Sequence, residues 1–254
     1  ELGGKSPAVL FDDFPMRLAA ERLLFGKCFN AGQVCTTVDH LFVPEAKVAG
    51  FVEMAKEIVT ARYPTLDTPD YTSIIDDRAF NRITNALQDA KERGATLVQL
   101  IPGKAWDKKT RKIAPHVVLN APADCELRTR EIFGPILPVI GYTNIEDTIT
   151  IINNGPRPLA LYPFSNKKKQ VHHLITHVMS GGVTVNDGIL HTAQHDMPFG
   201  GVGDSGMGHY HGYEGFLTFS KMRPVFYQAP FSAVKFMYPP YGKFATKYLD
   251  FLTK

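Results

Sequence analysis

The chain has 254 residues, of which 44% are hydrophobic and 21% charged, and 28 basic against 25 acidic residues give a net charge of +3. This composition is typical of a folded globular protein and excludes a disordered chain or a coiled coil. At about 150 residues per domain, the length allows one large domain or two small ones. The small net charge disfavours nucleic acid as a partner, because a phosphate-binding surface needs clustered lysines and arginines.

The sequence also indicates the cellular compartment of the protein and whether the chain is a fragment. It contains no run of about 18 apolar residues, so no bilayer span is predicted and a membrane is an unfavoured partner. The three cysteines are too few for a disulfide framework, and reduced thiols are typical of a cytoplasmic protein. The chain starts at Glu1 without an initiator Met, a basic leader or an apolar signal region. We therefore expect a fragment of a longer polypeptide.

In the first part of the chain, apolar runs alternate with segments of helical periodicity. Pro15 suits the first turn of a helix. Another helix is predicted after Ala46, where apolar residues recur every three to four positions: Val48, Val52, Ala55 and Val59. The segment 30–37 is too short and polar to form core. The expected elements are a strand at 7–11, a helix at 15–25, a strand at 38–43 and helices at 46–63 and 78–93.

The same alternation continues to about residue 185. Strands are expected at 96–100, 136–142, 159–164 and 182–185, a solvated lysine-rich loop at 103–112, and helices at 145–154 and from Ser165. The last helix is expected to face inward with Val171, Leu174, Ile175 and Val178. Strands that alternate with helices predict an α/β fold with an open, mainly parallel sheet. From about Arg223 the composition shifts to Pro, aromatic residues and Lys, which indicates a tail.

Two patterns suggest ligand binding but lack the context that it needs. Gly201, Gly203 and Gly206 match the dinucleotide fingerprint, yet no strand precedes them and more glycines follow, so a tightly packed glycine-rich turn is favoured. His173 and His177 have a spacing that can hold zinc, but no third ligand is evident. No metal site is expected. Four further histidines are dispersed, without ligand spacing: His191, His195, His209 and His211.

Cys35 is the candidate nucleophile. A Gly-Gln turn leads into it and two threonines follow, whereas Cys28 and Cys125 can be inert small hydrophobic residues. A thiol of ordinary pKa, near about 8.5, needs a local feature that favours the thiolate or a base that takes its proton. Spacing alone leaves both a catalytic and a structural role open for this residue.

Four motifs together resemble the aldehyde dehydrogenase superfamily, in the family's order over residues 1 to about 222. Glu1-Leu2-Gly3-Gly4-Lys5-Ser6-Pro7 is similar to the general-base motif and Gly32-Gln33-Val34-Cys35 to the cysteine motif. Glu131-Ile132-Phe133-Gly134-Pro135 resembles the cofactor-contact motif, and Pro198-Phe199-Gly200-Gly201 with Ser205-Gly206 resembles the late glycine-rich segment. The segments 158–162 and 180–184 look like the class 3 branch, which takes aromatic and fatty aldehydes.

The resemblance implies a mechanism for these residues. Cys35 would attack the aldehyde carbon to give a thiohemiacetal, and hydride transfer to NAD or NADP would leave a thioester. Glu1 would be the general base for the hydrolytic water, and the backbone N–H of Cys35 would stabilise the oxyanion. Glu131 would hold the nicotinamide ribose, and Phe133 would pack near the ring. The implied substrate is a small aldehyde, and the implied full-length protein is a homodimer.

The resemblance also implies what this chain does not contain. Most of the family's cofactor-binding domain, and the Asn that completes its oxyanion hole, precede the Glu-Leu-Gly-Gly-Lys motif. We therefore interpret residues 1–222 as the catalytic domain and 223–254 as a tail for docking or oligomer contact, and we expect the isolated chain to be inactive. In the tail, Phe244, Tyr248, Phe251 and Leu252 share a helical face, with Lys243, Lys247, Asp250 and Lys254 largely off it.

Two other functions stay open at this point. A reductase of acyl phosphates or acyl thioesters uses the same fold, a cysteine and hydride chemistry, but usually does not need the acid at Glu1. A non-catalytic assembly domain could keep the fold without activity, although the presence of both Glu1 and Cys35 argues against it.

Overall fold

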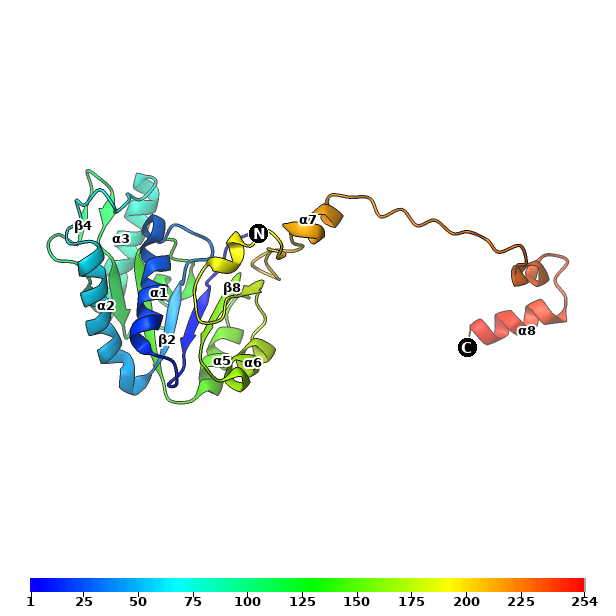
Figure 1. Cartoon of the computed structure of the whole chain (residues 1–254), viewed down its shortest axis with the longest axis horizontal. Coiled ribbons are helices and arrows are strands. Elements are labelled where there is room, and N and C mark those ends of the chain that lie inside the picture. Colours follow the sequence, from blue (N-terminus) through cyan, green and yellow to red (C-terminus); the bar gives the residue numbers. More distant parts are fainter. Residues whose placement is uncertain (254) are drawn as a thin grey trace. The chain divides into compact units, whose positions relative to one another are not determined.

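The structure is a computed structural model that describes residues 1–253, so Lys254 and its expected place off the tail helix's apolar face lie outside the described residues. The chain divides into two compact units, Glu1–Phe219 and a second that begins at Ser220. The first unit holds the sheet and all four motifs (Figure 1).

A seven-stranded sheet forms the centre of the first unit, in the order β3-β6-β7-β2-β1-β8-β9. All neighbours pair in parallel except β3 with β6, which are antiparallel. The strands are β1 (Pro7–Leu10), β2 (His40–Pro44), β3 (Thr96–Gln99), β6 (His116–Leu119), β7 (Ile136–Tyr142), β8 (Ala160–Phe164) and β9 (Gly182–Val183). The expected α/β class with an open, mainly parallel sheet is confirmed.

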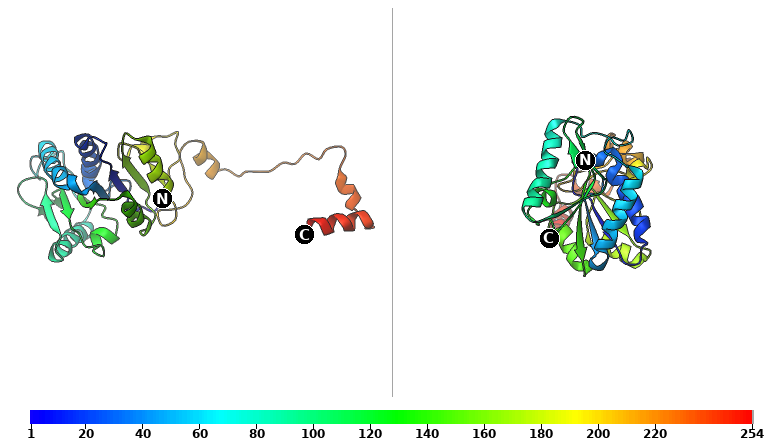
Figure 2. Two further views of the ribbon diagram at one scale, coloured as in Figure 1. Left: turned by 90° about the horizontal axis from the view of Figure 1, so that it is seen from below. Right: turned by 90° about the vertical axis from the view of Figure 1, so that its left-hand side faces the viewer.

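Helices lie on both sides of this sheet (Figure 2). They are α1 (Met16–Cys28), α2 (Val48–Arg62), α3 (Asp77–Glu92), α4 (Glu126–Thr129), α5 (Ile145–Asn153) and α6 (Lys168–His177), and the short α7 (Gly212–Thr218) follows them near the end of the unit. Side chains cap two of them: Asp76 accepts a hydrogen bond from the N–H of Ala79 at 2.7 Å, and Asn144 from that of Glu146 at 3.2 Å. Such caps satisfy N–H groups that the first helical turn leaves unpaired.

The core divides between the two faces of the sheet. Along β1, Ala8 and Leu10 belong to the larger apolar cluster, which includes residues of α1, α2 and α3. Val9 belongs to the smaller cluster, with Ile149 of α5 and Leu174 of α6. This alternation follows from the two-residue period of a strand, and it explains why β1 is apolar throughout. Because β1, β2 and β7 are parallel, the loops that precede these three strands lie at the same edge of the sheet.

Some expected elements differ from the structure. The segment 103–112 is not simply a loop, because Trp106–Asp107 and Lys112–Ile113 pair as the short antiparallel strands β4 and β5. The strand β6 was not expected. The prediction that Ile175 faces inward is wrong, since its side chain is 39% exposed while Leu174 is fully buried. Only a narrow stripe of α6 contacts the sheet.

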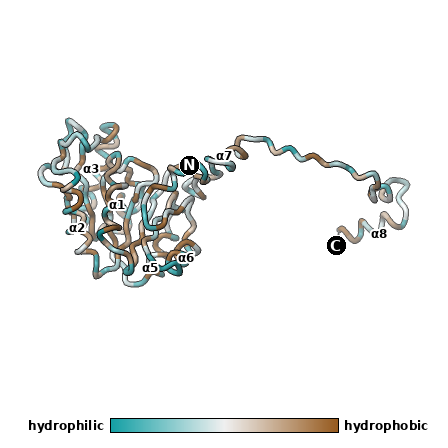
Figure 3. Tube along the Cα trace, in the orientation of Figure 1, coloured by the Kyte–Doolittle hydropathy of each residue, from teal (hydrophilic) through white to brown (hydrophobic). Residues whose placement is uncertain are grey.

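The second unit contains the short helix η4 (Ala233–Met237), which was not expected, and the helix α8 (Lys243–Leu252), which spans the segment expected to have a helical face. Within this unit Ala245 is buried, whereas Tyr248, Phe251 and Leu252 remain exposed. Apolar residues continue along the segment between Ser220 and η4 (Figure 3), including the exposed Val225, Phe226 and Tyr227. Among the described residues, no helix has the length and apolar character needed to cross a bilayer.

Candidate active site

The segment Glu1–Gly4 lies against the glycine-rich segment of residues 200–206 (Figure 1). The N–H of Leu2 donates to the carbonyl of Ser205 at 2.9 Å. A Cβ on Gly206 would stand 3.2 Å from the Cα of Glu1, and one on Gly201 would stand 1.8 Å from the carbonyl oxygen of Ser205. The glycines therefore serve close backbone packing around Glu1, in agreement with the favoured interpretation of a packed turn.

Cys35 lies in a tightly folded loop between α1 and β2. After α1 the chain enters a left-handed stretch, with φ of 49° at Asn30, 51° at Ala31 and 73° at Gly32. The side chain of Gln33 holds this loop, because its Nε2 donates to the carbonyl of Ser73 at 3.1 Å and its Oε1 accepts from the N–H of Ile75 at 2.9 Å. The bend ends the helix and exposes part of Cys35.

Buried polar contacts support the Cys35 loop from behind. Nζ of Lys27 donates to the carbonyl of Val38 at 2.9 Å, and Oγ1 of Thr37 donates to the carbonyl of Gly26 at 3.0 Å. The hydroxyl of Tyr162, on β8, donates to the carbonyl of Thr36. Burial lowers the pKa of Lys27 to about 8, with Asp39 acting in the opposite direction. These bonds join the end of α1 to the start of β2 and fix the span that carries the thiol.

A second strained turn carries Phe133. This residue adopts a left-handed φ of 47°, and the backbone of the preceding Ile132 is held on both sides. Its N–H donates to Oδ2 of Asp39 at 2.8 Å, and its carbonyl accepts from Arg82 at 2.6 Å. A Cβ on Gly32 would lie 2.2 Å from the carbonyl oxygen of Gly134, so the Phe133 turn and the Cys35 loop touch backbone to backbone.

Glu131 reaches from this turn to the Glu1 segment. A Cβ on Gly3 would stand 2.7 Å from its Oε2, and the backbone N–H of Gly4 donates a hydrogen bond to its carboxylate. Burial raises the pKa of Glu131, and the Gly4 bond opposes that shift. The glycines at 3 and 4 thus leave room for a carboxylate that is half-buried and held, next to an exposed Phe133.

Electrostatics places Glu1 beside Cys35. Partial burial, together with a hydrogen bond to Glu1 and the charge of its carboxylate, raises the pKa of the Cys35 thiol to about 11. Glu131 contributes a smaller effect of the same sign. The thiol is therefore protonated at neutral pH, and the carboxylate of Glu1 is the neighbouring group that can accept its proton. The backbone N–H of Cys35 donates to no group among the described residues, which leaves it available for a developing oxyanion.

Tyr210 is a neighbour of this site that the sequence analysis did not find. Its hydroxyl is hydrogen-bonded to Glu1, and partial burial with the charges of Glu1 and Cys35 raises its pKa. Histidines that look dispersed in the sequence gather nearby, since the rings of His195 and His211 lie 5.6 Å apart and His191 packs on Phe199 at 5.9 Å. The sequence contains little sign of these contacts, because these residues lie far along the chain from the cysteine motif.

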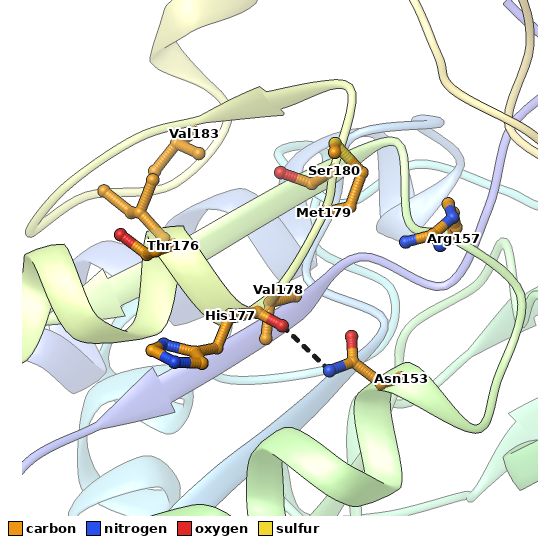
Figure 4. A pocket seen from close by; sticks show the side chains of 9 residues that line it. Asn153, Arg157, Thr176, His177, Val178, Met179, Ser180 and Val183 are labelled. Carbon is orange, nitrogen blue, oxygen red and sulfur yellow. Dashed lines mark hydrogen bonds between the residues drawn. The ribbon is translucent and has the colours of Figure 1, made fainter.

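Other polar groups and hollows lie apart from the four segments. Among residues 1–253, no group of three or more His, Cys, Asp or Glu could hold a metal ion. His173 instead binds Glu146 at 2.7 Å. A hollow of about 600 Å³ lies between α5, α6 and β9 (Figure 4), with Asn153 donating to the carbonyl of His177 at 2.8 Å. Its lining includes neither Cys35 nor Glu131.

The site predicts an order of cysteine reactivity. We expect iodoacetamide to alkylate Cys35 well ahead of Cys28 and Cys125, because these two are 3% and 0% exposed and burial raises the pKa of Cys28 to about 12. The rate should rise about tenfold per pH unit until the pH nears the pKa of Cys35, since the thiolate is the nucleophile. Peptide mapping by mass spectrometry measures this order, with Cys35→Ser as the control. Equal labelling of all three thiols would contradict the assignment of Cys35 as the reactive thiol.

Comparison with known proteins identifies the family. The sequence profile of the aldehyde dehydrogenase family matches residues 1–225. The chain belongs to the aldehyde dehydrogenase family. The resemblance stated from the four motifs is thereby confirmed, and the motifs are the segments that the fold brings together.

Individual relatives agree with this assignment. Over 96% of its length the chain is 50% identical to a probable coniferyl aldehyde dehydrogenase of Pseudomonas aeruginosa. A substrate-bound structure of AldH from Staphylococcus aureus superposes with a TM-score of 0.85 at 33% identity, over 100% of this chain and 54% of the other. An NADP-dependent glyceraldehyde-3-phosphate dehydrogenase from Bacillus halodurans, solved with NADP, gives 0.79 at 28% identity, over 88% and 46%. The chain spans about half the length of the curated relatives it matches.

Proposed function

We propose that this chain is the catalytic half of an NAD(P)-dependent aldehyde dehydrogenase that oxidises an aromatic aldehyde of the coniferyl type to its acid. The observation that carries the proposal is the close packing of three distant segments. A Cβ on Gly32 of the Cys35 loop would stand 2.2 Å from the carbonyl oxygen of Gly134, and one on Gly3 of the Glu1 segment would stand 2.7 Å from Oε2 of Glu131. The relative of 50% identity is described as acting on coniferyl aldehyde. By resemblance to the family, the full-length protein would be a homodimer, and its few cysteines suit a cytoplasmic location.

The chemistry follows from the positions of Cys35 and Glu1. Glu1 accepts the proton of the Cys35 thiol, and the sulfur attacks the carbonyl carbon while the aldehyde oxygen becomes an oxyanion. The backbone N–H of Cys35 donates to that oxyanion. Once the adduct has been oxidised to the thioester, Glu1 releases the thiol proton to solvent and then takes a proton from water. The hydroxide attacks the thioester, the carboxylic acid leaves, and the proton held by Glu1 returns to the Cys35 thiolate. The hydrogen bond from Tyr210 orients the carboxylate of Glu1 for both transfers.

Glu131 and Phe133 are the cofactor contacts in this proposal. NAD or NADP, when bound, supplies the acceptor for the hydride of the adduct. Glu131 would hold the ribose hydroxyls by accepting their hydrogen bonds, and Phe133 would pack beside the ring. Glu131 suits this role because the Gly4 N–H orients its carboxylate at the opening of the site. Further cofactor contacts belong to the half of the relatives that this chain does not match.

Two exposed aromatic residues that precede Cys35 in the sequence support an aromatic substrate. Phe25 and Phe29, on the last turn of α1 and the residue that follows it, are each 51% exposed, and their ring centroids are 5.8 Å apart. Such exposed rings six to ten positions before the thiol offer an apolar surface to an incoming ring. This surface supports an aromatic or fatty aldehyde over a small charged one.

The proposal predicts that activity needs both halves of the enzyme. The isolated chain should give no NADH or NADPH from coniferyl aldehyde, because most cofactor contacts and the second oxyanion donor are missing. A chimera that places the unmatched half of the Pseudomonas aeruginosa relative before Glu1 should form NADH or NADPH, measured by absorbance. Its Cys35→Ala variant is the control. Aldehyde-dependent turnover by the isolated chain would contradict the proposed division of labour.

A further inference from the structure

A buried carboxylate, Asp39, connects three segments of the candidate site. It follows the Cys35 loop, where its own N–H donates to the carbonyl of Ser6 at 2.8 Å. Its Oδ1 accepts from Nζ of Lys5, and its Oδ2 accepts from the N–H of Ile132 at 2.8 Å. Its exposed fraction is 2%. One side chain therefore bonds to the Glu1 segment and to the Phe133 turn while it belongs to the Cys35 segment.

The partner of Asp39 is equally restrained. Nζ of Lys5 also donates to the carbonyls of Leu127 at 3.1 Å and Arg130 at 2.9 Å. Lys5 follows Gly3 and Gly4, whose backbone borders the carboxylate of Glu131. The Asp39–Lys5 pair thus sets the position of Glu131 from two directions. The first set of contacts connects Asp39 through Lys5 to Gly3 and Gly4. The second connects Asp39 to Ile132, whose backbone is next to Glu131.

Because Asp39 and Lys5 are charged and buried, breaking their ion pair is strongly unfavourable in free energy. Burial alone would raise the pKa of Asp39, but Lys5 and His40 lower it well below its ordinary value. Asp39 is therefore ionised in the working enzyme. The groups that face it are the ammonium groups of Lys5 and Lys27 and the ring of His40, whose own pKa burial lowers. Asp39 in turn raises the pKa of Glu131. A buried pair that loses one member leaves an uncompensated charge, so the contact geometry is strongly specified.

We propose that Asp39 is a positioning residue that fixes Glu131 and Phe133 relative to Cys35 and thereby sets the affinity for the nicotinamide cofactor. It touches neither aldehyde nor cofactor and acts through the N–H of Ile132 and through Lys5. The inference rests on the proposed function, because Glu131 and Phe133 are taken as the cofactor contacts. Asp39 lies in the sequence between the cysteine motif and the cofactor-contact motif and has no role in the mechanism above. The inference therefore adds one residue to the proposed function.

The test compares Asp39→Asn and Asp39→Glu with the parent in the full-length enzyme that contains this chain. Asn keeps an acceptor for the Ile132 N–H and removes the charge, whereas Glu keeps the charge and displaces it by one methylene. We expect both variants to raise the KM for NAD(P) at least 10-fold, with kcat per titrated Cys35 within about threefold of the parent. In Asp39→Asn, the buried Lys5 loses its charged partner. The double variant Lys5→Met with Asp39→Asn removes that lysine, and it should fold and show the same rise in the KM for NAD(P).

A matched control is Thr148→Val on α5, a fully buried hydroxyl that has no partner among the described residues. It should leave both kinetic constants unchanged. An unchanged KM for NAD(P) in the Asp39 variants, or activity that falls only in proportion to titratable Cys35, overturns the inference.

Direct cofactor binding separates this inference from the proposed function. Calorimetric titration with NAD and NADP measures affinity without turnover. If the parent binds cofactor but oxidises no aldehyde, the proposed function fails, while a weakened affinity in Asp39→Asn still supports the positioning role. If the parent is active and the variants bind cofactor with unchanged affinity, the inference alone is overturned. A parent that binds neither cofactor overturns both.

Discussion

Replacing Glu1 by Gln in the full-length enzyme is expected to lower steady-state aldehyde oxidation by about 10²- to 10⁴-fold, the range lost when a general base is removed. The amide cannot accept a proton from water, so the thioester on Cys35 should accumulate. The substitution also removes a charge that raises the pKa of Cys35, so the thiolate should form at lower pH than in the parent. At alkaline pH, a first burst of NADH or NADPH should therefore persist while turnover stops.

Stopped-flow absorbance measures the burst, and mass spectrometry after acid quenching identifies the acylated peptide. The matched control is Glu57→Gln, an exposed carboxylate on α2 that pairs with Arg17 at 2.8 Å far along the chain from any motif. Turnover that survives in Glu1→Gln would favour the reductase of acyl phosphates or acyl thioesters, whose chemistry needs no hydrolytic base. A role for Glu1 in forming the thiolate alone would instead abolish both burst and turnover at neutral pH and restore both at alkaline pH, where the thiolate forms without a base.

The fold was readable from the sequence because most of its elements are locally determined. β1 and β8 are buried on both faces, and such strands appear as short continuous apolar runs. The strand β6 was missed because its pairing with β3 is antiparallel at a sheet edge, in a region dominated by a lysine-rich loop. Ile175 was misplaced because a helical period predicts a broad apolar stripe, whereas α6 buries only the line through Leu174 and Val178.

The candidate site was readable only in part. Motif residues such as Cys35 and Glu131 stand next to turn residues and can be noticed in the sequence. Their mutual distances depend on Asp39 and Lys5, which are 34 positions apart and pair only after β1 and β2 have aligned. The contact of Tyr210 with Glu1 likewise depends on the return of the glycine-rich segment to the N-terminal end. Long-range polar contacts of this kind leave no periodic signal.

Gly32→Ala is expected to lower the free energy of unfolding of this chain by about 2–5 kcal/mol, combining left-handed backbone strain with overpacking. The strain arises because φ at Gly32 is 73°, and the overpacking because a Cβ there would stand 2.2 Å from the carbonyl oxygen of Gly134. Since that contact joins the Cys35 loop to the Phe133 turn, the two must separate to admit the methyl group. Denaturant titration gives the free energy, and Cys35 alkylation reports the geometry.

Gly94→Ala separates the two causes of this loss. Gly94 ends α3 with a φ of 95°, but nothing lies within 4 Å of the position a Cβ would take. Its substitution should cost only the left-handed strain, about 1–2 kcal/mol, and leave the alkylation rate of Cys35 unchanged. Equal destabilisation by the two variants, with Cys35 equally reactive in both, would mean that the Gly32–Gly134 approach does not hold the site together. A larger loss at Gly32, with altered thiol reactivity, follows if the close backbone contact is what sets the distance from nucleophile to cofactor turn.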